Sequence, residues 1–257
     1  MARAWNEPKI RLNQRYKNVL TTREAPPAHS NLHHQSPHNA HPMHAPKVAL
    51  IHALAHSVAP VNEAFAWQWP EARLMNLLDD SLSADLARAN GLDAAMDQRF
   101  ATLAAYALDQ GGAQAILFTC SAFGPCIEAV ARARPQVPIL KPNEAMVAEA
   151  TQRGGALGLV ATFGPTLVSM PPEFGPGVLH HTELAAGALD ALNRGDAATH
   201  DALIVQAALA LKARGCQLIA LAQFSMARAK SACEVATGLP VLTTVDSALA
   251  ALRSRLA

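Results

Sequence analysis

Short apolar runs alternate with amphipathic stretches from Lys47 to the end of the chain. The stretches at 92–110 and 198–215 carry apolar residues at helical spacing, which predicts helices. Eight other runs are apolar along most of their length, as parallel strands covered by helices on both faces are. These predicted strands lie at 47–53, 73–78, 113–119, 137–140, 155–161, 177–181, 216–222 and 239–242. Alternating strands and helices predict an α/β fold with open parallel sheets.

A weak internal repeat divides this region. Segments 115–140 and 218–242 share one plan of apolar strand, polar turn, Ala-rich helix, proline and short strand, with Cys120 and Gln223 at equivalent places. The repeat predicts two pseudo-symmetric α/β lobes, each a short parallel sheet flanked by helices. We assign 46–141 plus 241–257 to the first lobe and 142–240 to the second. Because ligands bind beyond the carboxyl ends of parallel strands, we expect the active site between the lobes.

The first 45 residues have a different composition. They hold six of the eleven histidines among Pro, Asn, Ser and Gln, at His29, His33, His34, His38, His41 and His44. So few apolar residues predict a disordered arm that cannot form a core. A metal site needs fixed geometry that such an arm does not supply, so no metal site is predicted.

Charge and cysteine usage narrow the function classes. A formal net charge of +1, from 21 basic and 20 acidic residues, gives no reason to expect nucleic acid or a membrane surface as partner, so we expect a small molecule. No apolar run reaches the ~18 residues of a membrane span, and no secretory signal is evident. Four cysteines without metal-site spacing predict reduced thiols in the cytoplasm. No glycine-rich phosphate loop is present, and no cofactor is expected.

Cys120 is the candidate catalytic residue. It follows a predicted strand and precedes a helix, and a helix N-terminus lowers the pKa of a thiol below the ordinary ~8.5. The alternative is a small buried residue, since free cysteines are commonly buried. Cys126, Cys216 and Cys233 are interpreted as packing residues, because none of them lies at the carboxyl end of a strand.

Three short motifs carry a family resemblance: TCSAFGP at 119–125, ATFGPT at 161–166 and AQFSMARA at 222–229. Together they resemble the aspartate/glutamate/hydantoin racemase superfamily, over residues 47–257. The resemblance implies two lobes with the site between them and no cofactor. Racemases of this group use a cysteine on each lobe to exchange a proton α to a carboxylate. The resemblance implies that Cys120 is the acid/base. It also implies that Thr162 and Thr166 contact the substrate carboxylate and that Ser121 is the polar residue after the thiol.

Gln223 stands where such a racemase has its second thiol, and an amide is no general base near neutral pH. We therefore keep three functions open for an expected small-carboxylate ligand: a racemase or isomerase of amino or dicarboxylic acids, a one-cysteine decarboxylase or other lyase, and a non-catalytic sensor. The candidate substrate-binding residues are His52, Ser57, Ser121, Ala122, Thr162, Thr166, Gln223 and Ser225.

Several further residues have two interpretations. His52 is either catalytic or a hydrogen-bonded structural residue, and Asn143, between Lys141 and Glu144, either faces the cleft or caps a helix. His180 and His181, at the end of a predicted strand, are candidates for the missing second base. Trp67 and Trp69 are interpreted as packing on a lobe edge or on a partner subunit, which leaves a homodimer open.

Overall fold

The computed structural model describes residues 45–89 and 91–257. The predicted arm of residues 1–45, with its six histidines, lies outside the described residues except for Ala45. None of the helices in the described part of the chain has the length and apolar character needed to cross a membrane.

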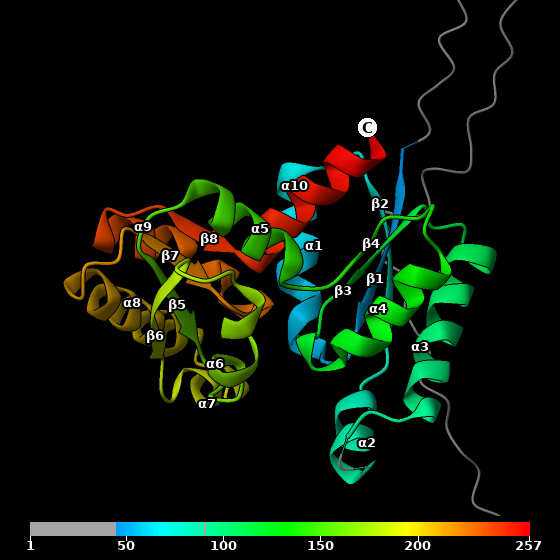
Figure 1. Cartoon of the computed structure of the whole chain (residues 1–257), viewed down its shortest axis with the longest axis horizontal. Coiled ribbons are helices and arrows are strands. Elements are labelled where there is room, and N and C mark those ends of the chain that lie inside the picture. Colours follow the sequence, from blue (N-terminus) through cyan, green and yellow to red (C-terminus); the bar gives the residue numbers. More distant parts are fainter. Residues whose placement is uncertain (1–44, 90) are drawn as a thin grey trace, which may run out of the picture. The chain divides into compact units, whose positions relative to one another are not determined.

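Two four-stranded parallel sheets form the framework, and they share one strand order (Figure 1). The first has the order β2-β1-β3-β4, and the second β6-β5-β7-β8. Ile51 lies opposite Phe118 in the first sheet, and Val160 lies opposite Leu221 at the same place in the second. The predicted pseudo-symmetric lobes are therefore confirmed. The strands are β1 (Lys47–His52), β2 (Arg73–Leu78), β3 (Ala115–Phe118), β4 (Ile139–Leu140), β5 (Leu157–Ala161), β6 (Leu179–Leu184), β7 (Leu218–Leu221) and β8 (Val241–Thr243).

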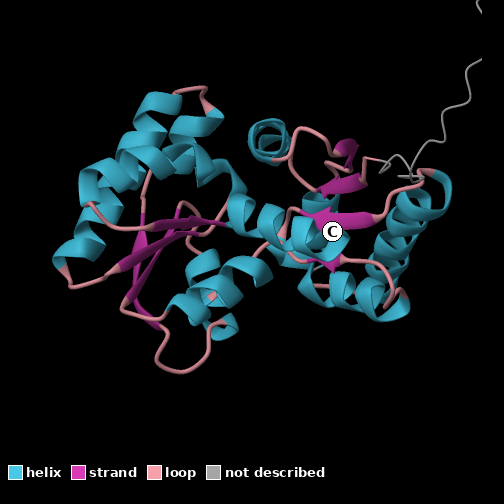
Figure 2. Cartoon of the chain, turned by 90° about the horizontal axis from the view of Figure 1, so that it is seen from above, coloured by secondary structure: helices cyan, strands magenta, loops and turns pink. Residues whose placement is uncertain are grey.

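Helices cover both faces of the first sheet, because its two central strands alternate side chains between two cores. Ile51 and Phe118 point into the core under α2 (Leu82–Ala89), α3 (Ala94–Ala105) and α4 (Gly124–Ala133). The helix α3 continues as the π-helix η3 (Tyr106–Gln110). Leu50 and Leu117 point into the opposite core, with α1 (Val58–Gln68) and α10 (Thr244–Leu256). Figure 2 shows helices on both sides of the strands.

The second sheet is covered in the same way. Val160 and Leu221 share a core with α8 (Ala197–Ala213), α9 (Lys230–Thr237) and α7 (Ala188–Asn193). Leu159 and Ala220 belong to the opposite core, with α5 (Glu144–Arg153) and the short helix α6 (Thr166–Ser169). Met170 and Phe174, which flank the 3-10 turn η5 (Pro171–Glu173), are buried in the same core.

The C-terminal segment 241–257 is divided between the lobes, which corrects its assignment to the first lobe. The strand β8 pairs with β7 and completes the second sheet. The helix α10 then packs Val245, Leu249 and Leu252 into the core of the first sheet. Phe224, from the second lobe, is buried in that same core, so the two lobes share apolar contacts.

Candidate functional site

Cys120 lies just beyond the carboxyl end of β3. The Thr119 N–H donates to the Ile51 carbonyl at 3.0 Å, which extends the pairing of β3 with β1 by one residue. Cys120 follows in an extended conformation, with φ −130° and ψ 121°, and precedes the 3-10 turn η4 (Ser121–Phe123). It is partly exposed, whereas Cys126, Cys216 and Cys233 are buried. Cys120 is therefore the one cysteine of the four that is not fully buried.

Burial raises the pKa of the Cys120 thiol above its ordinary value, while the Ala122 backbone N–H acts in the opposite direction. The expectation of a lowered pKa at this strand-to-helix turn is therefore wrong. Burial also raises the pKa values of the three buried cysteines. For Cys126, burial and then a hydrogen bond with Asp97 raise the pKa to about 12. Near neutral pH, Cys120 is a protonated thiol that can donate a proton.

Gln223 occupies the place in the second lobe that Cys120 occupies in the first. Each follows its strand by two residues, and Gln223 has the same extended backbone, with φ −122° and ψ 150°, before the 3-10 turn η6 (Phe224–Ala229). The Gln223 Oε1 accepts the Thr162 backbone N–H at 2.9 Å, and its Nε2 donates to Thr166 Oγ1 at 3.5 Å. The amide therefore ties the turn after β5 to the turn after β7.

His52 ties neighbouring strands of the first sheet together, as Gln223 ties two turns together in the second lobe. It is fully buried, with Nδ1 at 2.9 Å from Thr119 Oγ1 and Nε2 at 3.0 Å from Asn76 Oδ1. Burial lowers the pKa of His52, against the opposing effect of the Asn76 hydrogen bond. Both ring nitrogens are committed, so the structure supports the structural interpretation of His52 and leaves no nitrogen for a ligand.

Thr119 continues this network toward the next turn. Its hydroxyl lies 3.1 Å from Ser57 Oγ, and the Ser57 hydroxyl donates to the Leu54 carbonyl at 2.7 Å. Neither Asn76 nor Thr119 was predicted as a site residue. The signal for Asn76 was present, since it is the polar residue within an otherwise largely apolar strand.

The other predicted contact residues differ in their access to solvent. Ser121 and Ala122 are exposed and Ser225 is half-buried, whereas Ser57, Thr162 and Thr166 are buried at 7–8% exposure.

Ser57 and Thr166 are equivalent positions in the two lobes, each six residues beyond the paired Ile51 or Val160. The turn η2 (Ala55–Ser57) contacts η6, so strand-end turns of the two lobes meet there. Convergence of all eight residues on one cleft stays a prediction.

A small hollow lies beside Cys120. It leaves no room for a water molecule, and it is lined by Ile51, His52, Ala53, Leu82, Phe100, Phe118 and Cys120. Five of these seven side chains are apolar, and the two ring nitrogens of His52 are already hydrogen-bonded.

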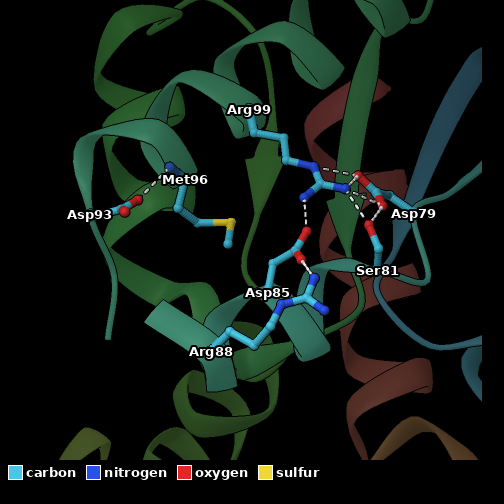
Figure 3. Close-up of polar contacts among 7 residues, drawn as sticks. All are labelled: Asp79, Ser81, Asp85, Arg88, Asp93, Met96 and Arg99. Atoms are coloured by element: carbon cyan, nitrogen blue, oxygen red, sulfur yellow. Dashed lines mark hydrogen bonds and ion pairs between the residues drawn. The ribbon is translucent and has the colours of Figure 1, made fainter. Parts of the chain in front are cut away.

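An ion-pair network, also missed from the sequence, borders this part of the lobe. Figure 3 shows Arg99 of α3 facing Asp79, which follows β2, and Asp85 of α2. Its Nε lies 2.6 Å from Asp79 Oδ2, and its Nη1 lies 2.5 Å from Asp85 Oδ2. The Asp79 N–H donates to the His52 carbonyl at 3.0 Å, which links the network to the end of β1.

His180 and His181 lie near the amino end of β6 and not at the end of a strand, where the sequence placed them. The strand β6 runs on to Leu184, and His181 pairs with Gly158 near the start of β5. Three further residues at ~3.3 Å each separate His181 from the carboxyl end of the strand. Neither histidine therefore replaces the missing base at Gln223.

Other predicted positions have structural roles. Asn143 stands at the N-cap of α5 without a side-chain cap, and its Nδ2 instead donates to Glu173 Oε1 at 3.5 Å. Trp69 is buried and stacks on Phe65, whereas Trp67 is 86% exposed. The described residues contain no group of three or more His, Cys, Asp or Glu that could hold a metal ion.

Solved structures share this fold at low sequence identity. Allantoin racemase from Pseudomonas fluorescens matches 81% of this chain and 89% of its own, at 17% identity and a TM-score of 0.58. Glutamate racemase from Bacillus anthracis matches 83% and 82%, at 13% identity and a TM-score of 0.61. Unliganded arylmalonate decarboxylase matches 82% and 93%, at 14% identity and a TM-score of 0.57. At these identities the similarity establishes the fold.

A search of curated proteins found no match. The family model described as Asp/Glu/Hydantoin racemase, however, matches residues 61–252, which is most of the chain. The protein therefore belongs to the Asp/Glu/Hydantoin racemase family.

Proposed function

We propose that this protein is a cofactor-independent enzyme that transfers a proton at the carbon α to a carboxylate of a small amino or dicarboxylic acid, with Cys120 as the acid/base. The observation that carries the proposal is the contrast between two equivalent strand ends. One presents a partly exposed thiol, and the other presents an amide that is engaged in holding two turns together.

This contrast favours chemistry with a single proton transfer from a cysteine. A lyase reaction of this kind is decarboxylation of a dicarboxylic acid with both carboxylates on its α-carbon, in which the bond from that carbon to one carboxylate breaks and carbon dioxide departs. The electron pair passes to the remaining carboxylate as an enediolate, and the Cys120 S–H protonates the α-carbon. The thiolate then regains its proton from water. A raised thiol pKa suits the donor role, because the thiol is protonated when the intermediate forms.

Racemisation or isomerisation is the second candidate, supported by the family itself and by the allantoin and glutamate racemases that share the fold. It requires a group that removes a proton as well as one that returns it. Gln223 cannot remove a proton near neutral pH. A racemase would therefore use Cys120 with a second base that is not at the equivalent position.

The substrate carboxylate would contact hydroxyl groups at the strand ends. Ser121 is exposed beside Cys120, and Ser225 is half-buried beside Gln223, so both can reach a ligand. Thr162 and Thr166 are more buried, and Gln223 holds the turn that carries them. We propose Ser121 and Ser225 as the direct contacts and the two threonines as the floor of the site. The four cysteines are free, in keeping with a reducing compartment such as the cytoplasm.

The test is turnover of amino acids, dicarboxylic acids and substituted malonates in deuterated water, with carbon dioxide release and deuterium at the α-carbon both measured. Cys120→Ser should lower the active reaction by about 10²- to 10⁴-fold while the melting temperature stays unchanged, because a general acid is lost. Cys216→Ala is the control, since Cys216 is buried before the amino end of β7.

The outcomes separate the candidate functions. Carbon dioxide release with one deuterium incorporated identifies a lyase, and exchange into recovered substrate identifies a racemase or isomerase. Ligands that raise the melting temperature without any turnover would favour a sensor. Full activity of Cys120→Ser would contradict the proposal.

A further inference from the structure

The turns after the four central strands carry two side chains that can exchange a proton near neutral pH. These turns, all within the described residues, follow β1, β3, β5 and β7 at 53–57, 119–124, 162–166 and 222–226. They contain no Asp, Glu, Lys, Arg or Tyr, and their two titratable residues are Cys120 and His56. An imidazole both accepts and donates a proton near neutral pH, which the Gln223 amide cannot do. His56 is therefore the side chain on these turns that can act as a base beside the Cys120 thiol.

His56 belongs to a turn that is attached to both halves of the site. The Ser57 hydroxyl of η2 lies 3.1 Å from Thr119 Oγ1, next to Cys120. The same turn contacts η6, which directly follows Gln223. Ser57 is buried, whereas His56 is exposed. The fold thus fixes the backbone of this turn between the two equivalent strand ends and leaves the imidazole accessible.

Other ionisable groups near the strand ends are engaged or lie farther from Cys120. Both ring nitrogens of His52 are hydrogen-bonded. Asp79 and Lys141, which follow the edge strands β2 and β4, are each held in an ion pair, and Figure 3 shows that of Asp79. Asp80 also follows β2, which β1 separates from β3 in the sheet. None of these groups matches the position and availability of His56.

We propose that His56 is the second proton-transfer group of this site, and that it removes the α-proton which Cys120 replaces on the opposite face of the carbon. The inference rests on the proposed function and identifies the base that its racemase form requires. The neutral imidazole takes the α-proton, and the C–H electron pair passes into the substrate carboxylate as an enediolate. The Cys120 S–H then protonates the same carbon, which leaves a thiolate and an imidazolium. Water returns the proton from the imidazolium to the thiolate after the product departs.

Racemisation in deuterated water tests the assignment, with the L-forms of aspartate, glutamate, alanine and phenylalanine as probes. His56→Gln should lower inversion at the α-carbon by about 10²- to 10⁴-fold, because a general base is lost. The melting temperature should stay unchanged, because His56 is exposed. His181→Gln is the matched control and should leave kcat/KM unchanged. His181 is also exposed, but it lies three residues before the carboxyl end of β6.

Two further measurements separate a base from a structural residue. The kcat/KM of the unmodified protein should rise with pH over the range in which histidines titrate, because His56 accepts a proton when it is neutral. His56→Gln should lose this rise. Imidazole added to His56→Ala should raise its activity about 10-fold, because a free base can enter at the exposed turn, but it should not restore Cys120→Ser.

The outcomes keep this inference apart from the proposed function. Racemisation that survives in His56→Gln but is lost in Cys120→Ser would overturn the role of His56 and retain Cys120 as the acid/base. Full activity of Cys120→Ser would contradict the proposed function instead. Release of carbon dioxide from a substituted malonate without racemisation of any of the four amino acids would overturn the role of His56, as would the absence of any turnover.

Discussion

At the scale of single residues, the environment of Cys120 decides its protonation state. A strand end followed by a helix suggested a stabilised thiolate, but the thiol is partly buried and its pKa is raised. The position of Cys120 was predictable from the internal repeat. The direction of its pKa shift was not, because burial depends on side chains such as Leu82 that come from distant parts of the sequence.

Alkylation with iodoacetamide tests this environment. Cys120 should react first of the four cysteines because it is the one that is partly exposed. Its rate should rise with pH through a midpoint above that of a free thiol, since only the thiolate attacks and burial disfavours it. Peptide mapping of labelled protein at several pH values measures both. A midpoint below that of a small free thiol would show that the thiolate is stabilised instead.

At the scale of elements, burial explains which strands the sequence predicted well. The central strands β1, β3, β5 and β7 are buried along almost their whole length, and their apolar runs located them. The edge strand β6 extends to Leu184 through exposed and half-exposed polar residues, so its apolar run ended too early. That difference is why His180 and His181 were placed at the wrong end of the sheet.

Close packing of α8 on the second sheet gives a prediction for Gly158. A Cβ at Gly158 would lie 2.8 Å from Cys216 Sγ and 2.9 Å from Leu211 Cδ1, which is too close. Gly158→Ala should lower the free energy of unfolding by about 1–3 kcal/mol, as overpacking does. Gly175→Ala is the control, because its nearest neighbour would be Val178 at an ordinary 3.9 Å. Urea unfolding measures both, and equal stability of the two variants would contradict the prediction.

At the scale of the described molecule, the C-terminal helix joins the two lobes. The repeat predicted two lobes but assigned the whole of 241–257 to one of them. The sequence could not reveal the division, because the β8 segment and α10 are both apolar enough to fit either core. In the structure, α10 and Phe224 are both buried in the core of the first sheet.

This shared core predicts that the lobes unfold together. Tryptophan fluorescence, reporting in part on Trp67 and Trp69, and far-ultraviolet circular dichroism, reporting on both lobes, should give coincident urea transitions. Leu252→Ala, at a fully buried α10 position, should cost about 2–5 kcal/mol, whereas Leu209→Ala, 40% exposed on α8, should change little. Two separated transitions in the unmodified protein would show that the lobes are independent.

The raised pKa of Cys120 also bears on oxidative damage. Peroxide oxidises the thiolate rather than the thiol, and the first product, a sulfenic acid, is formed in proportion to the thiolate present. Because burial keeps Cys120 protonated near neutral pH, its oxidation by peroxide should be slow despite its partial exposure. The same burial that would suit the thiol to the proposed proton donation therefore protects it against loss by oxidation.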